Sequence, residues 1–287
     1  MVDKILIDII NEERKKLRMY FYWQLFWGII FVLLVLVSSV FFGLKNKEFW
    51  IYVIMPLIVL GSFWVFVQSS FDNVNLRYKQ KVLKVIIERY FIDFNFYPDY
   101  KLNKQVFELN FGFKSIFRLS SRNAITGEIE DLPITMCYYR IDKQTERGVL
   151  TIMSGIYINV DLDFTLPKFA IYPQRQDLKE FFHVSNLKEL QTKLSEDFIV
   201  YSESKEIISI LEKIGPDILK YSNICAKPEN FILTTFNNKL NLLFVDGREF
   251  INFSLKEKVS EQIVKNEIKH LKNCLEFIGK LLLHLSK

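Results

Sequence analysis

The sequence predicts an α+β protein: an N-terminal two-helix transmembrane hairpin, then a cytoplasmic mixed or antiparallel sheet domain with packed helices and a long C-terminal helix. Half of the residues are apolar and 15% are aromatic, and the excess is concentrated between residues 20 and 70. Beyond that segment, short runs that alternate apolar and polar residues predict strands. An apolar stripe at three- and four-residue intervals over 256–285 predicts the final helix.

Two uncharged runs form the predicted hairpin, residues 20–71. The first run, Tyr20–Phe42, is long enough to cross a hydrocarbon core of about 30 Å as a helix. Gly43–Glu48 supplies a polar turn, and the second run is Phe49–Phe71. The first run is too long for the apolar part of a signal peptide and ends in bulky phenylalanines instead of small residues. We therefore expect an internal anchor.

Positive charge flanks the hairpin on one side. Basic residues precede the first run and follow the second, namely Lys4, Arg14, Lys15, Lys16, Arg18, Arg77, Lys79, Lys81 and Lys84. The turn between the runs offers only Lys45 and Lys47. The positive-inside rule thus predicts a multi-pass protein of the inner, cytoplasmic membrane with both termini in the cytoplasm. The basic flanks would attract anionic lipids, each residue near the surface contributing on the order of 1 kcal/mol.

The rest of the chain divides into three parts. Residues 1–19 are predicted to be an amphipathic helix. Residues 72–100 continue the second span as a connecting helix, which Tyr97–Tyr100 breaks. Residues 101–287 form the cytoplasmic α+β domain.

Strands are expected in most of that domain. Phe107, Leu109, Phe111 and Phe113 alternate with polar or small residues, which is typical of a half-buried strand. Asn237-Asn238 tolerates the left-handed backbone of a tight hairpin turn. The remaining strands are predicted at 134–141, 149–161, 168–172, 231–236, 240–245 and 249–253.

Three helices are predicted within or after these strands. Residues 204–213 form one helix, ended by Gly215-Pro216, and 217–221 form a second, short one. The third, 256–285, carries the apolar stripe Val259, Ile263, Leu271, Leu275, Ile278, Leu282 and Leu285.

Several segments together resemble a known family. They are Tyr78–Val82, Thr126–Glu128, Gly155–Ile158, Phe198–Ser202 followed by the helix Glu206–Leu211, Phe231–Thr234 and Leu240–Val245. With the hairpin in front of them, they resemble the bacterial family catalogued as domain of unknown function 3137, over residues 70–255. Ser204 and Lys205 depart from the acidic and arginine residues of that family. The resemblance implies a membrane-associated bacterial protein and no known reaction, so it transfers no catalytic residue.

The sequence assigns no catalytic, cofactor-binding or metal-binding residue. His270 and His284 lie about 21 Å apart on one predicted helix and cannot share a metal, and His183 is remote from both in sequence. Asp161 and Asp163 alternate on one strand face, which we interpret as a solvated strand end. Cys137 lies in an apolar strand pattern, so we interpret it as core. No phosphate loop, nucleophile elbow or metalloprotease motif is present, and no cofactor is expected.

Partners follow from the same features. The lipid bilayer is the first, because the hairpin is integral to it. A formal net charge of +5, much of it beside the apolar runs, favours anionic lipid head groups over nucleic acid. Aromatic residues in the strands alternate as a core does, without interleaved Arg or Lys for base stacking, so no nucleic-acid partner is expected.

These observations favour a membrane-anchored cytoplasmic binding or scaffold module, with a protein partner, over an enzyme. Two alternatives stay open: a membrane-bound hydrolase or transferase that uses scattered carboxylates, and an oligomeric membrane effector. Associating hairpins favour small-residue faces. Small residues are present without a GxxxG pattern, at Gly28, Ser38, Ser39, Gly61 and Ser62.

Overall fold

A computed structural model gives the fold. It describes residues 4–46, 49–91, 93–113, 118–146, 148–174, 187–192, 194, 197–225, 230–245, 247 and 253–286, without the side chains of 42–53 and 222–225.

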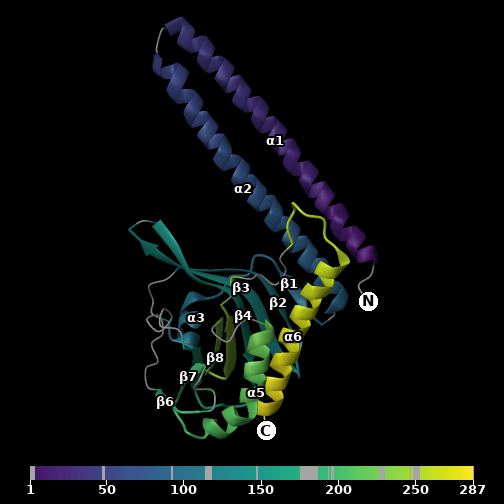
Figure 1. The fold of residues 1–287 in the computed structure, drawn as a ribbon, viewed down its shortest axis with the longest axis vertical. Coiled ribbons are helices and arrows are strands. Elements are labelled where there is room, and N and C mark those ends of the chain that lie inside the picture. The colour runs from purple at the N-terminus through teal and green to yellow at the C-terminus, as the bar shows by residue number, and fades with distance from the viewer. Residues whose placement is uncertain are drawn as a thin grey trace. The chain divides into compact units, whose positions relative to one another are not determined.

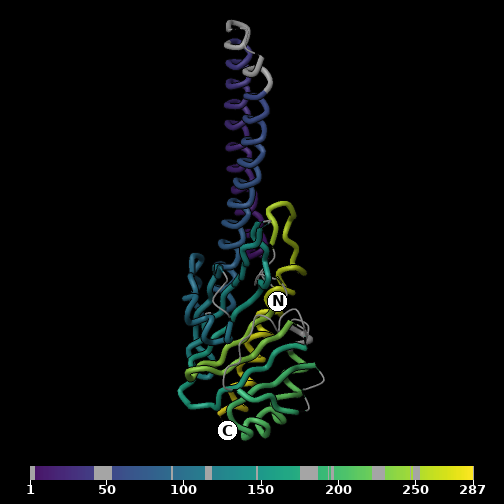
Figure 2. The backbone as a smooth tube through the Cα atoms, turned by 90° about the vertical axis from the view of Figure 1, so that its left-hand side faces the viewer, coloured from purple at the N-terminus to yellow at the C-terminus, as the bar shows by residue number. Residues whose placement is uncertain are grey.

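Two long helices open the chain and run side by side (Figure 1 and Figure 2). Helix α1 is Lys4–Asn46 and α2 is Phe49–Tyr90, with Pro56 inside α2. The predicted amphipathic helix and first span are therefore one uninterrupted helix. The rings of Phe21 and Phe71 meet edge to face, with centroids 5.5 Å apart, which fixes the register of the two helices at that level.

Both helices are long and apolar enough to cross a membrane, over Lys4–Phe41 and Ile54–Tyr90. In the most apolar 18-residue stretch of the first helix, only 11% of the residues are buried in the protein, and in that of the second helix none are. A core helix of a soluble protein would bury most of such a stretch. The exposure of both stretches therefore agrees with helices whose apolar sides face lipid.

The second part of the chain forms an antiparallel sheet. Nine strands are present among the described residues, in the order β1-β2-β3-β4-β9-β8-β5-β7-β6. They are β1 Asn95–Tyr97, β2 Arg118–Ile129, β3 Leu132–Thr145, β4 Gly148–Asp161, β5 Phe169–Pro173, β6 Lys188–Leu190, β7 Phe198–Ser202, β8 Phe231–Phe236 and β9 Lys239–Phe244. The fold class is thus α+β as predicted, with every pairing antiparallel.

Helices cover both faces of this sheet. Helix α3, Lys104–Phe111, packs on one face through Phe107 and Phe111, against Tyr139, Tyr157 and Leu243 of the strands. Helices α5, Ile207–Cys225, and α6, Glu261–Leu285, lie on the other face (Figure 1). There the ring of Phe277 lies 5.1 Å from that of Tyr221 and 5.9 Å from that of Phe231. Successive residues of a strand point to opposite faces of the sheet, so each strand contributes side chains to the core on the α3 face and to the core on the α5 and α6 face.

The predicted strand at residues 107–113 is wrong, because this segment is helix α3 followed by a turn. The side-chain oxygen of Asn103 accepts hydrogen bonds from the backbone N–H groups of Gln105 and Val106. Gly112 ends the helix with a φ of 64°, and its N–H donates to the Glu108 carbonyl. Phe107 and Phe111 are four residues apart, so they also lie on one face of a helix, and the sequence pattern is compatible with either a strand or a helix. The capping residues Asn103 and Gly112 favour the helix.

Two helix boundaries also differ from prediction. Gly215-Pro216 does not end a helix, because α5 continues through it with Pro216 inside. Apolar side chains on both sides of the proline are buried, and their packing outweighs the lost hydrogen bond: Ile207, Leu211, Ile214, Ile218 and Tyr221. The C-terminal helix begins at Glu261, after the predicted start at 256. Residues 249–252 of the last predicted strand lie outside the described residues.

Two compact units result from these contacts. One consists of residues 1–82 with 253–264, and the other of 83–252 with 265–287. The segment before α6 therefore packs with the helical hairpin, although it lies far from it in sequence. Phe253, Leu255 and Val259 of this segment are buried. The Asn75 side-chain oxygen accepts a hydrogen bond of 2.8 Å from the Leu255 N–H.

Candidate functional site

Helix α3 presents two apolar side chains to solvent. Its inner face buries Phe107, Asn110 and Phe111 against the sheet. On its outer side Val106 is 44% exposed and Leu109 is 60% exposed. Single exposed apolar residues are ordinary on protein surfaces. Here the two lie three residues apart, on one helix face, and each borders a cavity.

A buried asparagine lies beneath this helix. Asn241 of β9 is fully buried on the α3 face of the sheet. Its side-chain oxygen accepts hydrogen bonds from the amide of Asn110 at 3.0 Å, the hydroxyl of Tyr157 at 3.1 Å and the amide of Asn159 at 2.8 Å. One helix, α3, and two strands, β4 and β9, thus meet at one oxygen. A buried amide without these partners would destabilise the fold, so the cluster positions α3 specifically.

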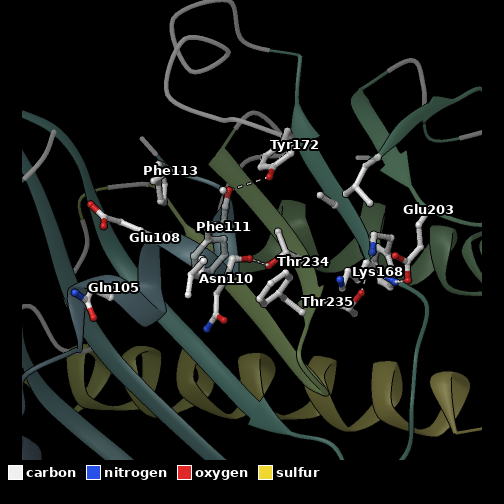
Figure 3. Close-up of a pocket in the computed structure, with 16 residues that line it drawn as sticks. Gln105, Glu108, Asn110, Phe111, Phe113, Lys168, Tyr172, Glu203, Thr234 and Thr235 are labelled. Atoms are coloured by element: carbon white, nitrogen blue, oxygen red, sulfur yellow. Dashed lines mark hydrogen bonds between the residues drawn. The ribbon is translucent and has the colours of Figure 1, made fainter. Parts of the chain in front are cut away.

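The larger cavity adjoins α3 on the side of Leu109. It has a volume of about 740 Å³ and lies over β5 and β8 (Figure 3). Its lining is mixed, with Phe111, Ala170 and Tyr172 as apolar walls and Thr234 among the polar groups. Lys168 and Glu203 lie together at one end, and Gln105 and Glu108 at the other (Figure 3). This volume is in the range of pockets that hold a small molecule or a few side chains of a partner.

Hydrogen bonds fasten the cavity wall. The Thr234 hydroxyl donates to the Asn110 carbonyl at 2.7 Å, and the Tyr172 hydroxyl donates to the Phe111 carbonyl at 3.0 Å (Figure 3). Both carbonyl groups belong to the last turn of α3, where no N–H group of the helix itself can donate to them, and these hydrogen bonds satisfy them. They also hold the helix end against β8 and β5.

A smaller cavity lies on the other side of α3, with a volume of about 140 Å³. Val106 and Phe107 of the helix line it together with Tyr100, Tyr157 and Asn159. Asn110 lines both cavities, so the two share one wall. The three side chains that donate hydrogen bonds to Asn241, those of Asn110, Tyr157 and Asn159, all line this smaller cavity.

Burial keeps the phenols of this face protonated. It raises the pKa of Tyr157, of Tyr172 and of Tyr100 above the ordinary value, because a phenolate would lose its hydration there. Each hydroxyl is thus a neutral hydrogen-bonding group at physiological pH. Burial likewise raises the pKa of Cys137, which is fully buried. The thiol is a core group, as predicted, and not a nucleophile.

The acidic residues considered from the sequence do not assemble a metal site. Asp161 forms an ion pair with Lys239, its neighbour across the β4–β9 pairing. Asp163 is exposed in the turn that follows β4. Among the described residues, no group of three or more His, Cys, Asp or Glu side chains could hold a metal ion.

The histidines are likewise separate. His284 lies 3.5 Å from Asp217, which joins α6 to α5 on the face opposite α3. His270 lies on α6, and His183 lies outside the described residues.

The sequence pattern alone does not identify Asn110, Asn241 or Tyr157 as site residues. A signal for Asn241 was present, because it is a polar residue on the inward face of an otherwise apolar strand, Lys239–Phe244. Buried amides need partners. Its partner Asn110 could not be found in this way, since that segment was assigned to a strand.

The fold and the site define an α+β domain with a partly apolar cleft beside a fixed helix, in a chain with two helices able to cross a membrane. No protein-family model, no curated protein and no solved structure matches this chain.

Proposed function

We propose that the chain is a membrane-anchored binding module, whose domain on the cytoplasmic side of the inner membrane holds a protein partner on the α3 surface. We define the α3 surface as Val106 and Leu109 with the two cavities that flank them. One observation carries the proposal: a pair of exposed apolar side chains lies on a helix fixed at both ends, beside a cleft of about 740 Å³. In protein interfaces, a few apolar side chains of the partner that enter such a cleft contribute most of the affinity.

Rigidity supports this role. Asn103 and Gly112 cap α3, and the Asn110–Asn241 hydrogen bond ties its centre to the sheet. A surface held in its bound shape before the partner arrives loses little conformational entropy on binding.

The chemistry of the cavities also favours binding over catalysis. The buried polar groups among the described lining residues include Asn110 and Thr234, which are neutral and already hydrogen-bonded within the protein. The ionisable residues Lys168 and Glu203 are exposed at one end, and Glu108, at the other end, is half-buried and pairs with Lys104 at 3.5 Å. General acid–base catalysis requires a titratable group held against the reacting atoms. A surface for contacts requires only shape, apolar area and satisfied polar groups.

We also propose, from the resemblance of residues 70–255, that the chain belongs to the bacterial family catalogued as domain of unknown function 3137, a resemblance that implies a membrane-associated protein. Two pairs of apolar residues, Val106/Leu109 on α3 and Val149/Leu150 on β4, provide a matched test. Each pair consists of one valine and one leucine, and all four side chains are exposed.

The experiment places a photo-reactive amino acid at Gln105, which lines the larger cavity, in the full chain in living cells. We expect a discrete crosslinked partner that the double variant V106E/L109E loses and V149E/L150E keeps. Equal crosslinking in all three proteins would contradict the proposed surface. A Tyr157→Phe variant that keeps the crosslink and the fold but loses cellular function would favour an enzyme instead.

A further inference from the structure

A row of polar side chains crosses the face of the sheet on which α3 lies. Residues paired across neighbouring strands point to the same face of a sheet. Successive pairings link Thr126 of β2, Thr135 of β3, Asn159 of β4, Asn241 of β9 and Thr234 of β8. Polar groups on a face that packs a helix need hydrogen-bond partners, so each part of this row has to find them.

Helix α3 satisfies one part of the row. Asn241 and Thr234 are buried beneath it. The Thr234 hydroxyl donates to the Asn110 carbonyl at 2.7 Å, and the Asn241 oxygen accepts from the Asn110 amide at 3.0 Å. These polar groups therefore hold the helix, and they are used within the protein.

The next part of the row opens into the smaller cavity. Thr135 and Asn159 are half-buried and line this space of about 140 Å³ together with Tyr100. Asn159 donates one amide N–H to Asn241 at 2.8 Å, so its second N–H and its carbonyl oxygen remain for another partner. With the described residues, the hydroxyls of Tyr100 and Thr135 form no hydrogen bond. The cavity thus offers groups that both donate and accept.

The charge of this cavity is balanced. Lys239 is the one charged residue of the described lining, and its amine pairs with the Asp161 carboxylate. Burial raises the pKa of Tyr100 and of Tyr157, so both phenols are uncharged at physiological pH. An anion would have to compete with Asp161 for Lys239, and a cation would meet no carboxylate in the described lining. The cavity therefore complements a neutral molecule.

Size and surface narrow the class of ligand further. A cavity needs about 10–15 Å³ to hold one water molecule, so this one accommodates a molecule of roughly ten non-hydrogen atoms. Leu102, Val106 and Phe107 give it an apolar side, formed by α3 and the segment before it. A sugar ring has this size and both kinds of surface, because its hydroxyl groups donate and accept while its C–H groups form an apolar face.

We propose that the smaller cavity binds one neutral monosaccharide, a pentose or a hexose. Its hydroxyl groups bond to Thr135, Asn159 and Tyr100, and its apolar face packs on Val106 and Phe107. The site adds a small-molecule ligand to the α3 surface and does not depend on the proposed protein partner.

The polar row offers matched variants. Thr135→Val removes a hydroxyl from the cavity, and Thr126→Val makes the same change at the neighbouring position of the row, outside the described lining. Tyr100→Phe removes a second hydroxyl from the cavity, and Tyr97→Phe, on a β1 side chain that is 50% exposed, is its control. Tyr100 lies outside the strands, so its variant tests the site even where Thr135→Val fails to fold.

The test is saturation-transfer NMR of the full chain in nanodiscs with a panel of neutral aldopentoses and aldohexoses, and with acetate and uracil as comparison ligands. We expect at least one sugar to bind the wild type, Thr126→Val and Tyr97→Phe. The dissociation constant of that sugar should rise several-fold in Thr135→Val and in Tyr100→Phe, with the melting temperature of the ligand-free chain kept.

Three results would overturn the proposal: no signal from any sugar, an unchanged dissociation constant in both cavity variants, or binding of acetate or uracil alone. The partner crosslinked at Gln105 is a separate readout. Its absence would contradict the proposed function and leave the sugar site standing, whereas loss of sugar binding with the crosslink kept would contradict this site alone.

Discussion

The side-chain amide of Asn11 forms two hydrogen bonds with the backbone of Val259, donating to its carbonyl at 3.1 Å and accepting from its N–H at 3.2 Å. The amide thus pairs with this residue as a neighbouring strand would. Val259 is 4% exposed, so water does not satisfy these backbone groups. The segment before α6 is joined to α1 at this point, over a sequence separation of 248 residues.

Replacing Asn11 with Ala should destabilise this junction by about 1–3 kcal/mol, because it leaves a buried N–H and C=O unpaired. Amide hydrogen exchange at Val259 in the detergent-solubilised chain measures the effect directly. Glu12→Ala is the matched control, since its side chain is exposed on the next position. Unchanged protection of Val259 in Asn11→Ala would show that the junction is held by apolar packing alone.

Asn241→Ala should lower stability more, by several kcal/mol, since three donors, two of them buried, lose their shared acceptor and a cavity forms. The free energy of unfolding from denaturant titration checks this. A loss no larger than that of Asn238→Ala, in the exposed turn of the same hairpin, would mean that the cluster does not hold α3 to the sheet.

Ile278→Ala should cost about 2–5 kcal/mol, because this α6 side chain is fully buried against the sheet. Leu283→Ala, on a side chain that is 46% exposed, should cost less than about 0.5 kcal/mol. Thermal unfolding of both variants in the full chain tests the assigned face of α6. Equal shifts in melting temperature would contradict it.

Lys280 and Tyr221 hold the pKa of Glu276 below its ordinary value of 4.5, because both form hydrogen bonds with the carboxylate, that of Lys280 having the larger effect. A carboxyl group whose folded pKa is lowered stabilises the fold above its unfolded pKa and loses this effect as pH falls through the folded pKa. Carboxyl NMR titration should therefore show the Glu276 pKa rising toward 4.5 in Lys280→Met, and by less in Tyr221→Phe. A wild-type pKa at or above 4.5 would contradict the geometry.

Local chemistry predicted several elements well. Asn237 and Asn238 do adopt left-handed backbone, with φ values of 50° and 56°, and join β8 to β9. The two uncharged runs do form long exposed helices. Segment α3 was missed because its phenylalanines fit both a strand and a helix, and the caps that decide between them are single residues.

The features that the sequence did not predict depend on tertiary contacts. On α6, Leu275 was expected in the buried stripe, but Phe277 is the residue that packs against Phe231. The helix rotation depends on the sheet it covers, which the sequence pattern does not contain. The same holds for Asn110 and Asn241, which are 131 residues apart. Their contact forms because α3 packs over β9, a tertiary contact that the local sequence of neither segment contains.

The central proposal is that the two long apolar helices span the membrane and that the domain lies on its cytoplasmic side. Its most direct test is labelling of single cysteines with a membrane-impermeant maleimide, in a chain whose native Cys137, Cys225 and Cys274 are replaced. We predict that a cysteine at Asn46, at the end of α1, is labelled in intact cells. A cysteine at the exposed Lys269 of α6 should be labelled only after permeabilisation. Labelling of the Lys269 position in intact cells would contradict the account.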